Sequence, residues 1–342
     1  LARAQSLLFM PDLFAYFLTG NKVSEYSIAT TSQLVDINTR DWSKEMLEKL
    51  GLPEKIFNRI VPSGSVTGYL SDEICEELGL EKVPVIAVCG HDTQSAVTAV
   101  PSEKEDFAFI SSGTWSLFGT ETKKPIVNDL SYSFNVTNEG GFGYSTAFLK
   151  NICGLWLIQE SRRQWIREGK EYSYAELEKA ALREKPFARF IDPDAPEFAV
   201  PGNLPARITE YCRRTGQSVP ENEGQTVRCI YESLALRYRA VLEGIEKCTG
   251  KNYDSLNVVG GGTKDTLLCK MTADACNITV YAGPIEATVM GNVAVQLISG
   301  GDIADVVEAR RIIANSGQLK CYSPENTAAW DEAYEKFKSV TK

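Results

Sequence analysis

The sequence predicts a mixed α/β fold. Residues 106–120 have the pattern of a β-hairpin, and residues 256–297 alternate strand, helix, strand and helix. This order of elements favours a mixed α/β sheet over a β-sandwich or a helical bundle. A chain of 342 residues also makes two domains the reasonable expectation, because single cores rarely grow beyond about 250–300 residues.

Composition and charge exclude several classes of protein. Hydrophobic residues make up 43% and charged residues 24% of the chain, which is typical of a globular protein and excludes a disordered or collagen-like one. The formal charge of −9 repels phosphate backbones and anionic membranes, so neither nucleic acid nor a membrane is expected as a partner. No apolar run is long enough to span a bilayer, and the first 20 residues lack the features of a secretory signal. We therefore predict a cytoplasmic protein, and its oligomeric state is left open.

The cysteines and the histidine do not indicate a metal site. The nine cysteines are dispersed among apolar neighbours without any C-x-x-C pair, as is typical of reduced core thiols. His91 is the only histidine of the chain and cannot by itself form a His-rich zinc site. We predict no metal ligands.

The first 20 residues have the apolar spacing of a helix packed on a core. The apolar positions that fit this pattern are Leu7, Leu8, Leu13, Phe14, Phe17 and Leu18. A helix packed on a core at the very start of a chain suggests a preceding segment, so we expect an N-terminally truncated protein.

The strongest candidate for a catalytic residue is Asp92. Residues 83–90 form a short apolar run that predicts a buried strand, and a helix rich in small residues follows at 94–100. An aspartate at the end of such a strand can accept a proton from a hydroxyl group held in a cleft. Alternatively, Asp92 caps the helix that begins at Thr93, which the pattern alone favours. The two roles do not exclude each other.

Three further features could contact a ligand. The predicted hairpin turn at 111–114 offers amides and hydroxyls to phosphate oxygens, or it is an ordinary turn. A helix predicted from Asn151 would carry Asn151 and Gln159 on one broad face, either facing a cleft or as a cap and a solvated side chain.

The third feature, the glycines 260–262, lies between a predicted strand (256–259) and a helix. These glycines allow close approach to a flat or anionic ligand, although a packing turn fits equally well. No Walker A loop, G-x-G-x-x-G motif or G-x-S-x-G elbow occurs.

Three motifs in fixed order resemble the FGGY family of carbohydrate kinases, and within it the rhamnulokinase branch. They are CGHDTQSAVTAVP at 89–101, FISSGTWSLFG at 109–119, and the segment 258–292 that begins VVGGGTKDTLL. The likeness covers most of the chain. It implies two ribonuclease-H-like (actin-like ATPase) domains, with a partial sugar-binding domain at 1–103 and an essentially complete nucleotide-binding domain at 104–342.

The resemblance also implies the reaction and the residues that carry it. ATP, with Mg²⁺, would phosphorylate L-rhamnulose to L-rhamnulose 1-phosphate, and Asp92 would be the catalytic base. The implied substrate-binding residues are His91, Asp92, Thr93 and Asn151, and the implied nucleotide-binding residues are Gly113, Thr114, Gln159, Gly260, Gly261 and Gly262.

The sequence departs from the family at one motif, and two alternatives stay open. The Asp-x-Gly-Thr/Ser phosphate loop of these kinases is absent, so the chain resembles their C-terminal two-thirds and is expected to turn over little sugar. One alternative is another sugar kinase of the family, acting on fuculose, xylulose or glycerol. The other is a non-catalytic, actin-like fragment that binds nucleotide or sugar.

Overall fold

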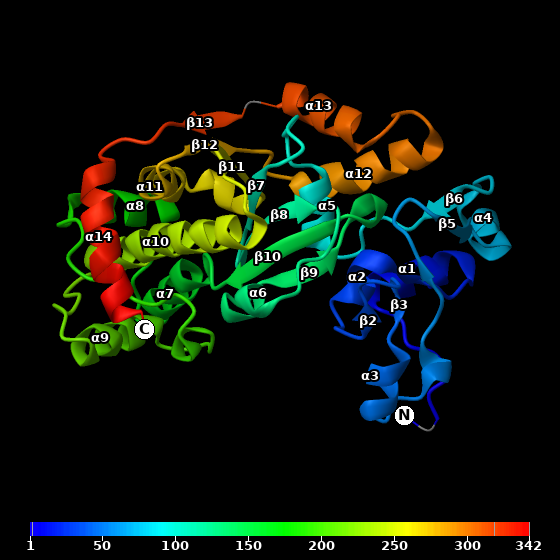
Figure 1. Cartoon of the computed structure of the whole chain (residues 1–342), viewed down its shortest axis with the longest axis horizontal. Helices are drawn as coiled ribbons and strands as arrows, with labels where there is room; N and C mark the ends of the chain where they lie inside the picture. Colours follow the sequence, from blue (N-terminus) through cyan, green and yellow to red (C-terminus); the bar gives the residue numbers. More distant parts are fainter. Residues whose placement is uncertain (2, 318, 342) are drawn as a thin grey trace. The chain divides into compact units, whose positions relative to one another are not determined.

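The computed structural model describes residues 1, 3–317 and 319–341, and the chain divides into two compact units (Figure 1). Unit 1 comprises Leu1–Asp106, Thr120–Leu149 and Glu286–Gly317, and unit 2 comprises Phe107–Gly119, Lys150–Ile285 and Gln318–Lys342. Each unit is therefore assembled from three separate stretches of the chain.

Unit 1 combines short strands with mostly short helices. Its helices are α1 (Met10–Thr19), α2 (Tyr26–Thr30), α3 (Lys44–Lys49), α4 (Asp72–Leu78), α5 (Asp92–Thr98), α6 (Asp129–Ser133), α12 (Ala287–Gly300) and α13 (Val306–Ser316). Its strands pair as β1 (Ser24–Glu25) with β4 (Ile60–Val61) in parallel, and as β2 (Val35–Asp36) with β3 (Asp41–Trp42) and β5 (Val66–Tyr69) with β6 (Pro84–Ile86) in antiparallel orientation. Helix α12 packs closely on α5, because Gly291 leaves no side chain between its backbone and the Ser95 carbonyl. This contact supports the helix that begins at Asp92.

A seven-stranded mixed sheet has the order β13-β12-β11-β7-β8-β10-β9. Its strands are β7 (Ala108–Ser112), β8 (Ser116–Thr122), β9 (Thr137–Gly140), β10 (Thr146–Ile152), β11 (Ser255–Val259), β12 (Thr279–Ala282) and β13 (Lys320–Tyr322). Strand β11 runs parallel to both β7 and β12, whereas β13 and β9 are antiparallel to their neighbours. The predicted mixed α/β sheet is confirmed, as is the hairpin formed by β7 and β8.

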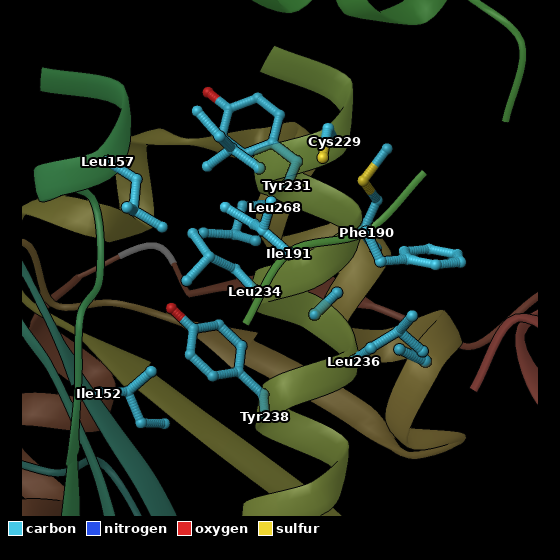
Figure 2. Close-up of a cluster of buried hydrophobic side chains, with 14 of the residues drawn as sticks. Ile152, Leu157, Phe190, Ile191, Cys229, Tyr231, Leu234, Leu236, Tyr238 and Leu268 are labelled. Carbon is cyan, nitrogen blue, oxygen red and sulfur yellow. The ribbon is translucent and has the colours of Figure 1, made fainter. Parts of the chain in front are cut away.

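The helices of unit 2 surround a large apolar core. They are α7 (Trp156–Arg167), α8 (Tyr174–Arg183), α9 (Leu204–Arg214), α10 (Glu223–Thr249), α11 (Thr266–Cys276) and α14 (Thr327–Val340). Helix α10 is the central one: Tyr231, Leu234 and Tyr238 are all buried on it (Figure 2). It ends at Gly250, whose φ of 68° is the left-handed conformation that a C-terminal glycine adopts readily. This helix and its glycine end agree with the sequence prediction.

Three local predictions were wrong. The run 83–90 does not form a buried strand: β6 covers only Pro84–Ile86 in a two-stranded sheet, and Val83 is 49% exposed. The predicted helix at Asn151 is instead the end of strand β10, and α7 begins at Trp156. In the first segment the helix itself is confirmed as α1 over Met10–Thr19, but the predicted packing is wrong, because Phe14 is 62% exposed. The first and third errors concern burial, which depends on the neighbours that cover an apolar run, and the second concerns the choice between helix and strand, which depends on strand pairing.

The nine cysteines are all free thiols. Across the described residues, none of the helices has the length and apolar character that a membrane span requires.

Candidate active site

Asp92 is the first residue of α5 and extends into solvent. Its side chain is 80% exposed, and its Oδ1 accepts a hydrogen bond from the backbone N–H of Thr93 at 2.7 Å. His91, not Asp92, occupies the N-cap position, and no side chain caps this helix. The capping alternative is therefore wrong, and most of the carboxylate surface is open to a substrate. The predicted neighbour Thr93 is buried, with 5% of its surface exposed.

The buried carboxylate of Glu25 anchors the loop that carries Asp92. Its Oε2 accepts hydrogen bonds from the backbone N–H of Gly90 at 2.9 Å and from the hydroxyl of Ser27 at 2.6 Å. The hydroxyl oxygen of Ser27 in turn accepts the N–H of His91 at 3.2 Å. Glu25 is only 2% exposed, and it also accepts from Ser63. Sequence reasoning missed Glu25, because nothing in its local pattern shows that it reaches a loop 65 residues away.

His91 lies between two carboxylates. Its Nδ1 is 3.1 Å from Oε2 of Glu139, and its Nε2 is 3.8 Å from Oδ1 of Asp92. Burial lowers the pKa of His91, but the adjacent Glu139 carboxylate and the charges of Asp92 and Glu25 outweigh it and hold the pKa above its ordinary value. Gln94, which is 1% exposed, donates from its Nε2 to the same Glu139 oxygen at 3.1 Å. Glu139 and Gln94 were not predicted as site residues.

Unit 2 contains a cavity of about 380 Å³ at the ends of two neighbouring strands. It is lined by Gly113, Thr114, Leu155, Ile158, Gln159, Tyr174, Glu178, Gly261, Gly262, Lys264 and Asp265. Strands β7 and β11 are parallel neighbours, with Ser111 opposite Val259, so the loops that follow them emerge at the same edge of the sheet. This pairing brings the hairpin turn and the glycine loop together. The hydroxyl of Thr114 also donates to Oε1 of Gln159 at 3.2 Å.

The three consecutive glycines have different roles in this loop. Gly260 is not among the residues that line the cavity. Its φ is 89°, and a Cβ there would lie 2.9 Å from the carbonyl oxygen of Ser112. A Cβ at Gly262 would lie 2.0 Å from the hydroxyl oxygen of Ser112. Gly261 has no heavy atom within 4 Å of its Cβ position. Gly260 and Gly262 are therefore required by packing, and only Gly261 opens freely on the cavity.

Two carboxyl groups that the sequence analysis missed also line the cavity. Burial, and then the charge and hydrogen bond of Asp265, raise the pKa of Glu178 to about 7. Burial likewise raises the pKa of Asp265, whose Oδ1 accepts the N–H of Leu268 at 2.9 Å at the start of α11. Asp265 was detectable as a polar residue three positions after Gly262, but Glu178 comes from the distant helix α8.

The sequence matches the two domain models of one protein family. Residues 1–99 match the N-terminal domain, and residues 108–300 the C-terminal domain, of the FGGY family of carbohydrate kinases. The chain belongs to the FGGY family. It is 47% identical to a rhamnulokinase of Bacteroides thetaiotaomicron over 342 residues, and 41% identical to one of Enterococcus faecalis over 324 residues. These matches cover 100% and 94% of this chain but 70% and 65% of the two relatives, so the chain spans about two thirds of their length.

Solved structures of FGGY sugar kinases share the fold. A ligand-bound xylulose kinase from Lactobacillus acidophilus superposes with a TM-score of 0.78 at 16% identity, covering 99% of this chain and 68% of that one. Plasmodium falciparum glycerol kinase with ADP gives a TM-score of 0.72 at 15% identity, with 96% and 64% covered. The predicted family and its actin-like α/β fold are confirmed.

The remaining predicted substrate-binding residue is Asn151, which belongs to a different unit from the other three. It is exposed on β10 in unit 2, whereas His91, Asp92 and Thr93 belong to unit 1. Because it lies on a strand and Gln159 on α7, the two residues do not share a helix face as predicted. Within the described residues, no group of three or more His, Cys, Asp or Glu side chains could hold a metal ion.

Proposed function

We propose that this protein catalyses the ATP-dependent phosphorylation of L-rhamnulose to L-rhamnulose 1-phosphate and ADP. The observation that carries the proposal is the cavity of unit 2, because five of the six residues expected to bind nucleotide line it. The substrate is inferred from the curated relatives, which carry the name rhamnulokinase at 37–47% identity.

Asp92 is the general base of the proposed reaction. A sugar hydroxyl becomes a better nucleophile as its proton passes to a carboxylate within hydrogen-bond distance. The 80% exposed side chain of Asp92 can accept that proton, and its loop is fixed by the buried Glu25. His91 and Thr93 are proposed to flank the sugar, and Asn151 is proposed as a further sugar-binding residue.

The cavity of unit 2 is proposed to bind the nucleotide. Its volume of about 380 Å³ lies within the range of small-molecule sites, roughly 300–1,000 Å³. Gly261 lets the backbone approach a ligand, and Thr114 and Gln159 offer polar groups beside it. Mg²⁺ enters the proposal only as the counter-ion of the ATP phosphates, since Mg²⁺ commonly binds through substrate phosphates rather than in an all-protein cage. We also propose that the sugar-binding domain ends at residue 103 and that the nucleotide-binding domain begins at residue 104. A further part of the proposal is that the protein is cytoplasmic.

A coupled assay of ADP release tests the proposed reaction. The full gene product would be compared on L-rhamnulose, L-fuculose, D-xylulose and glycerol, with Asp92→Asn as the test variant and Asp302→Asn, another exposed aspartate of unit 1, as the matched control. We expect a preference for L-rhamnulose and a loss of about 10²–10⁴ in kcat for Asp92→Asn alone.

Three other outcomes would contradict the proposal in different ways. Faster turnover of another sugar would show that the protein is a sugar kinase with a different substrate. Full activity of Asp92→Asn would show that Asp92 is not the general base. Binding of ATP without turnover of any of the four sugars would indicate a nucleotide-binding protein without kinase activity.

A further inference from the structure

The carboxylate of Glu139 lies beside the imidazole of His91, and the proposed reaction does not use this carboxylate. Nδ1 of His91 is buried, and among the described residues the Glu139 carboxylate, 3.1 Å away, is the polar group that the structure places beside it. The side chains of His91 and Glu139 are only 19% and 11% exposed. The two groups are not aligned as a hydrogen bond, but they lie within ion-pair distance, so the negative charge of Glu139 favours a proton on the ring.

Glu139 is itself held in place. Nε2 of Gln94 donates to the same carboxylate oxygen at 3.1 Å, and Gln94 is 1% exposed. Gln94 lies in the first turn of α5, two residues after Asp92, whereas Glu139 lies on β9. The backbone N–H of Gly140, the next residue on β9, donates to the hydroxyl of Thr30 at 3.0 Å. The side chain of Glu139 is thus fixed in position rather than mobile at the surface.

The protonation state of His91 determines whether its Nε2 accepts or donates a hydrogen bond. With a proton only on Nδ1, Nε2 is a hydrogen-bond acceptor, and in the doubly protonated ring it is a charged donor. Nε2 is 3.8 Å from Oδ1 of Asp92, so it lies on the side of the ring where the proposed base acts. The oxygen of a sugar that gives up its proton becomes negative, and a charged donor stabilises it where an acceptor would repel it.

We propose that Glu139 is a positioning residue, whose negative charge beside Nδ1 maintains the imidazolium of His91, so that Nε2–H donates to the substrate oxygen that Asp92 deprotonates. The identity of that oxygen rests on the proposed function, but the link between Glu139 and His91 does not. The charged groups that face the ring are Glu139 from β9, Asp92 from α5 and Glu25 from β1. All three favour the protonated ring, and Glu139 is the one in direct contact with Nδ1.

The single histidine makes this inference measurable without any assay of activity. In a protein without a histidine tag, the ring ¹⁵N and ¹H signals of histidine come from His91 alone. A pH titration by NMR is made on wild type, on Glu139→Gln, and on Glu121→Gln as a matched control. Glu121 is a carboxylate of the same unit that pairs with Arg310 at 2.9 Å instead of with His91. Glu139→Gln keeps the size of the side chain but removes its charge.

We expect the wild-type ring to titrate above the ordinary histidine value, Glu139→Gln to shift its midpoint to lower pH, and Glu121→Gln to leave it unchanged. The alkaline limb of kcat/KM for the sugar moves in the same direction in Glu139→Gln, and KM rises about tenfold, as the loss of one charge-assisted hydrogen bond predicts. An unchanged His91 midpoint in Glu139→Gln overturns the inference.

If Glu139→Gln does not fold, the wild-type titration decides the inference alone, because a midpoint below the ordinary histidine value overturns it. A protein that phosphorylates no sugar, but in which the His91 midpoint falls in Glu139→Gln, contradicts the proposed function and leaves the Glu139–His91 relationship supported.

Discussion

The backbone N–H of Gly90 donates a hydrogen bond of 2.9 Å to Oε2 of Glu25, a residue 65 positions earlier in the chain. The same buried carboxylate caps α2 through the N–H groups of Ser27 and Ile28. One anionic side chain thus joins a helix start to the loop that carries the proposed base. Removing a partner from such a buried network leaves several donors unsatisfied.

We therefore expect Glu25→Gln to lower the free energy of unfolding by about 1–3 kcal/mol, because a neutral amide is a weaker acceptor and its NH₂ group faces other donors. Urea denaturation measures this loss. Glu45→Gln is the control: Glu45 forms an exposed pair with Lys49, so its loss should change stability by less than about 0.5 kcal/mol. Equal stabilities of the two variants would contradict the role of Glu25.

We expect alanine at Gly262 and at Gly261 to affect different properties, protein stability at Gly262 and ATP binding at Gly261. Gly262→Ala places a Cβ 2.0 Å from the Ser112 hydroxyl oxygen, so it should destabilise the protein by about 1–3 kcal/mol. Gly261→Ala meets no atom within 4 Å and should unfold like wild type, but its methyl group narrows the cavity and should weaken ATP binding about tenfold. Thermal unfolding and calorimetric titration with ATP separate the two effects. Unchanged ATP affinity in a stable Gly261→Ala would place the nucleotide elsewhere.

Nucleotide binding should depend on pH through Glu178. Its pKa is raised to about 7 by burial and by Asp265, so Glu178 is mostly neutral below pH 7 and becomes an anion above it. A negative charge at the wall of the cavity repels the ATP phosphates, so ATP affinity should fall as the pH rises from about 6 to about 8. Glu178→Gln stays neutral throughout and should lose this dependence. The test is ATP titration at several pH values, and an identical pH dependence in both proteins would argue against it.

Stability should depend on pH through Asp12. This buried carboxyl accepts the N–H of Glu25 at 3.0 Å, its Oδ2 has no hydrogen-bond partner among the described residues, and burial raises its pKa from 3.8 to about 7. The folded protein therefore holds this proton more tightly than the unfolded chain. The stability that Asp12 contributes is complete below about pH 3.8 and is lost as the pH rises through about 7.

Asp12→Asn should therefore gain stability relative to wild type as the pH rises from about 5 to about 7, by at most about 1.4 kcal/mol per pH unit. Urea denaturation of both proteins at each pH measures the difference, in which the contributions of other titrating groups cancel. A difference that stays constant with pH would mean that Asp12 does not titrate in this range.

Much of the local structure follows from the sequence alone. The strand at 255–259, the glycines and helix α11 were predictable, since strand, turn and helix patterns lie within a few residues of one another. The end of α10 at Gly250 was predictable for the same reason. The candidate site residues Asp92, Thr114 and Gly261 were selected from motifs that reflect such local order.

Other features depend on partners that are far away in the chain. The apolar run 83–90 has the composition of a buried strand, but only the tertiary structure shows that its strand pairs with β5 alone. Asn151 follows a run that suits either a helix or a strand, and the antiparallel pairing of β10 with β9 selects the strand. Propensity is a weak preference that the surrounding structure overrides.

The family, the mixed α/β fold and five of the eleven residues that line the cavity of unit 2 follow from the sequence alone. Tertiary structure alone decided that Glu25 would hold the loop of Asp92, that Glu139 would face His91, and that Glu178 would share a cavity with Asp265. The physical reason is that turns and strand ends are set by neighbouring residues, whereas the partner and the pKa of a buried charge are set by residues that only folding brings within a few ångströms.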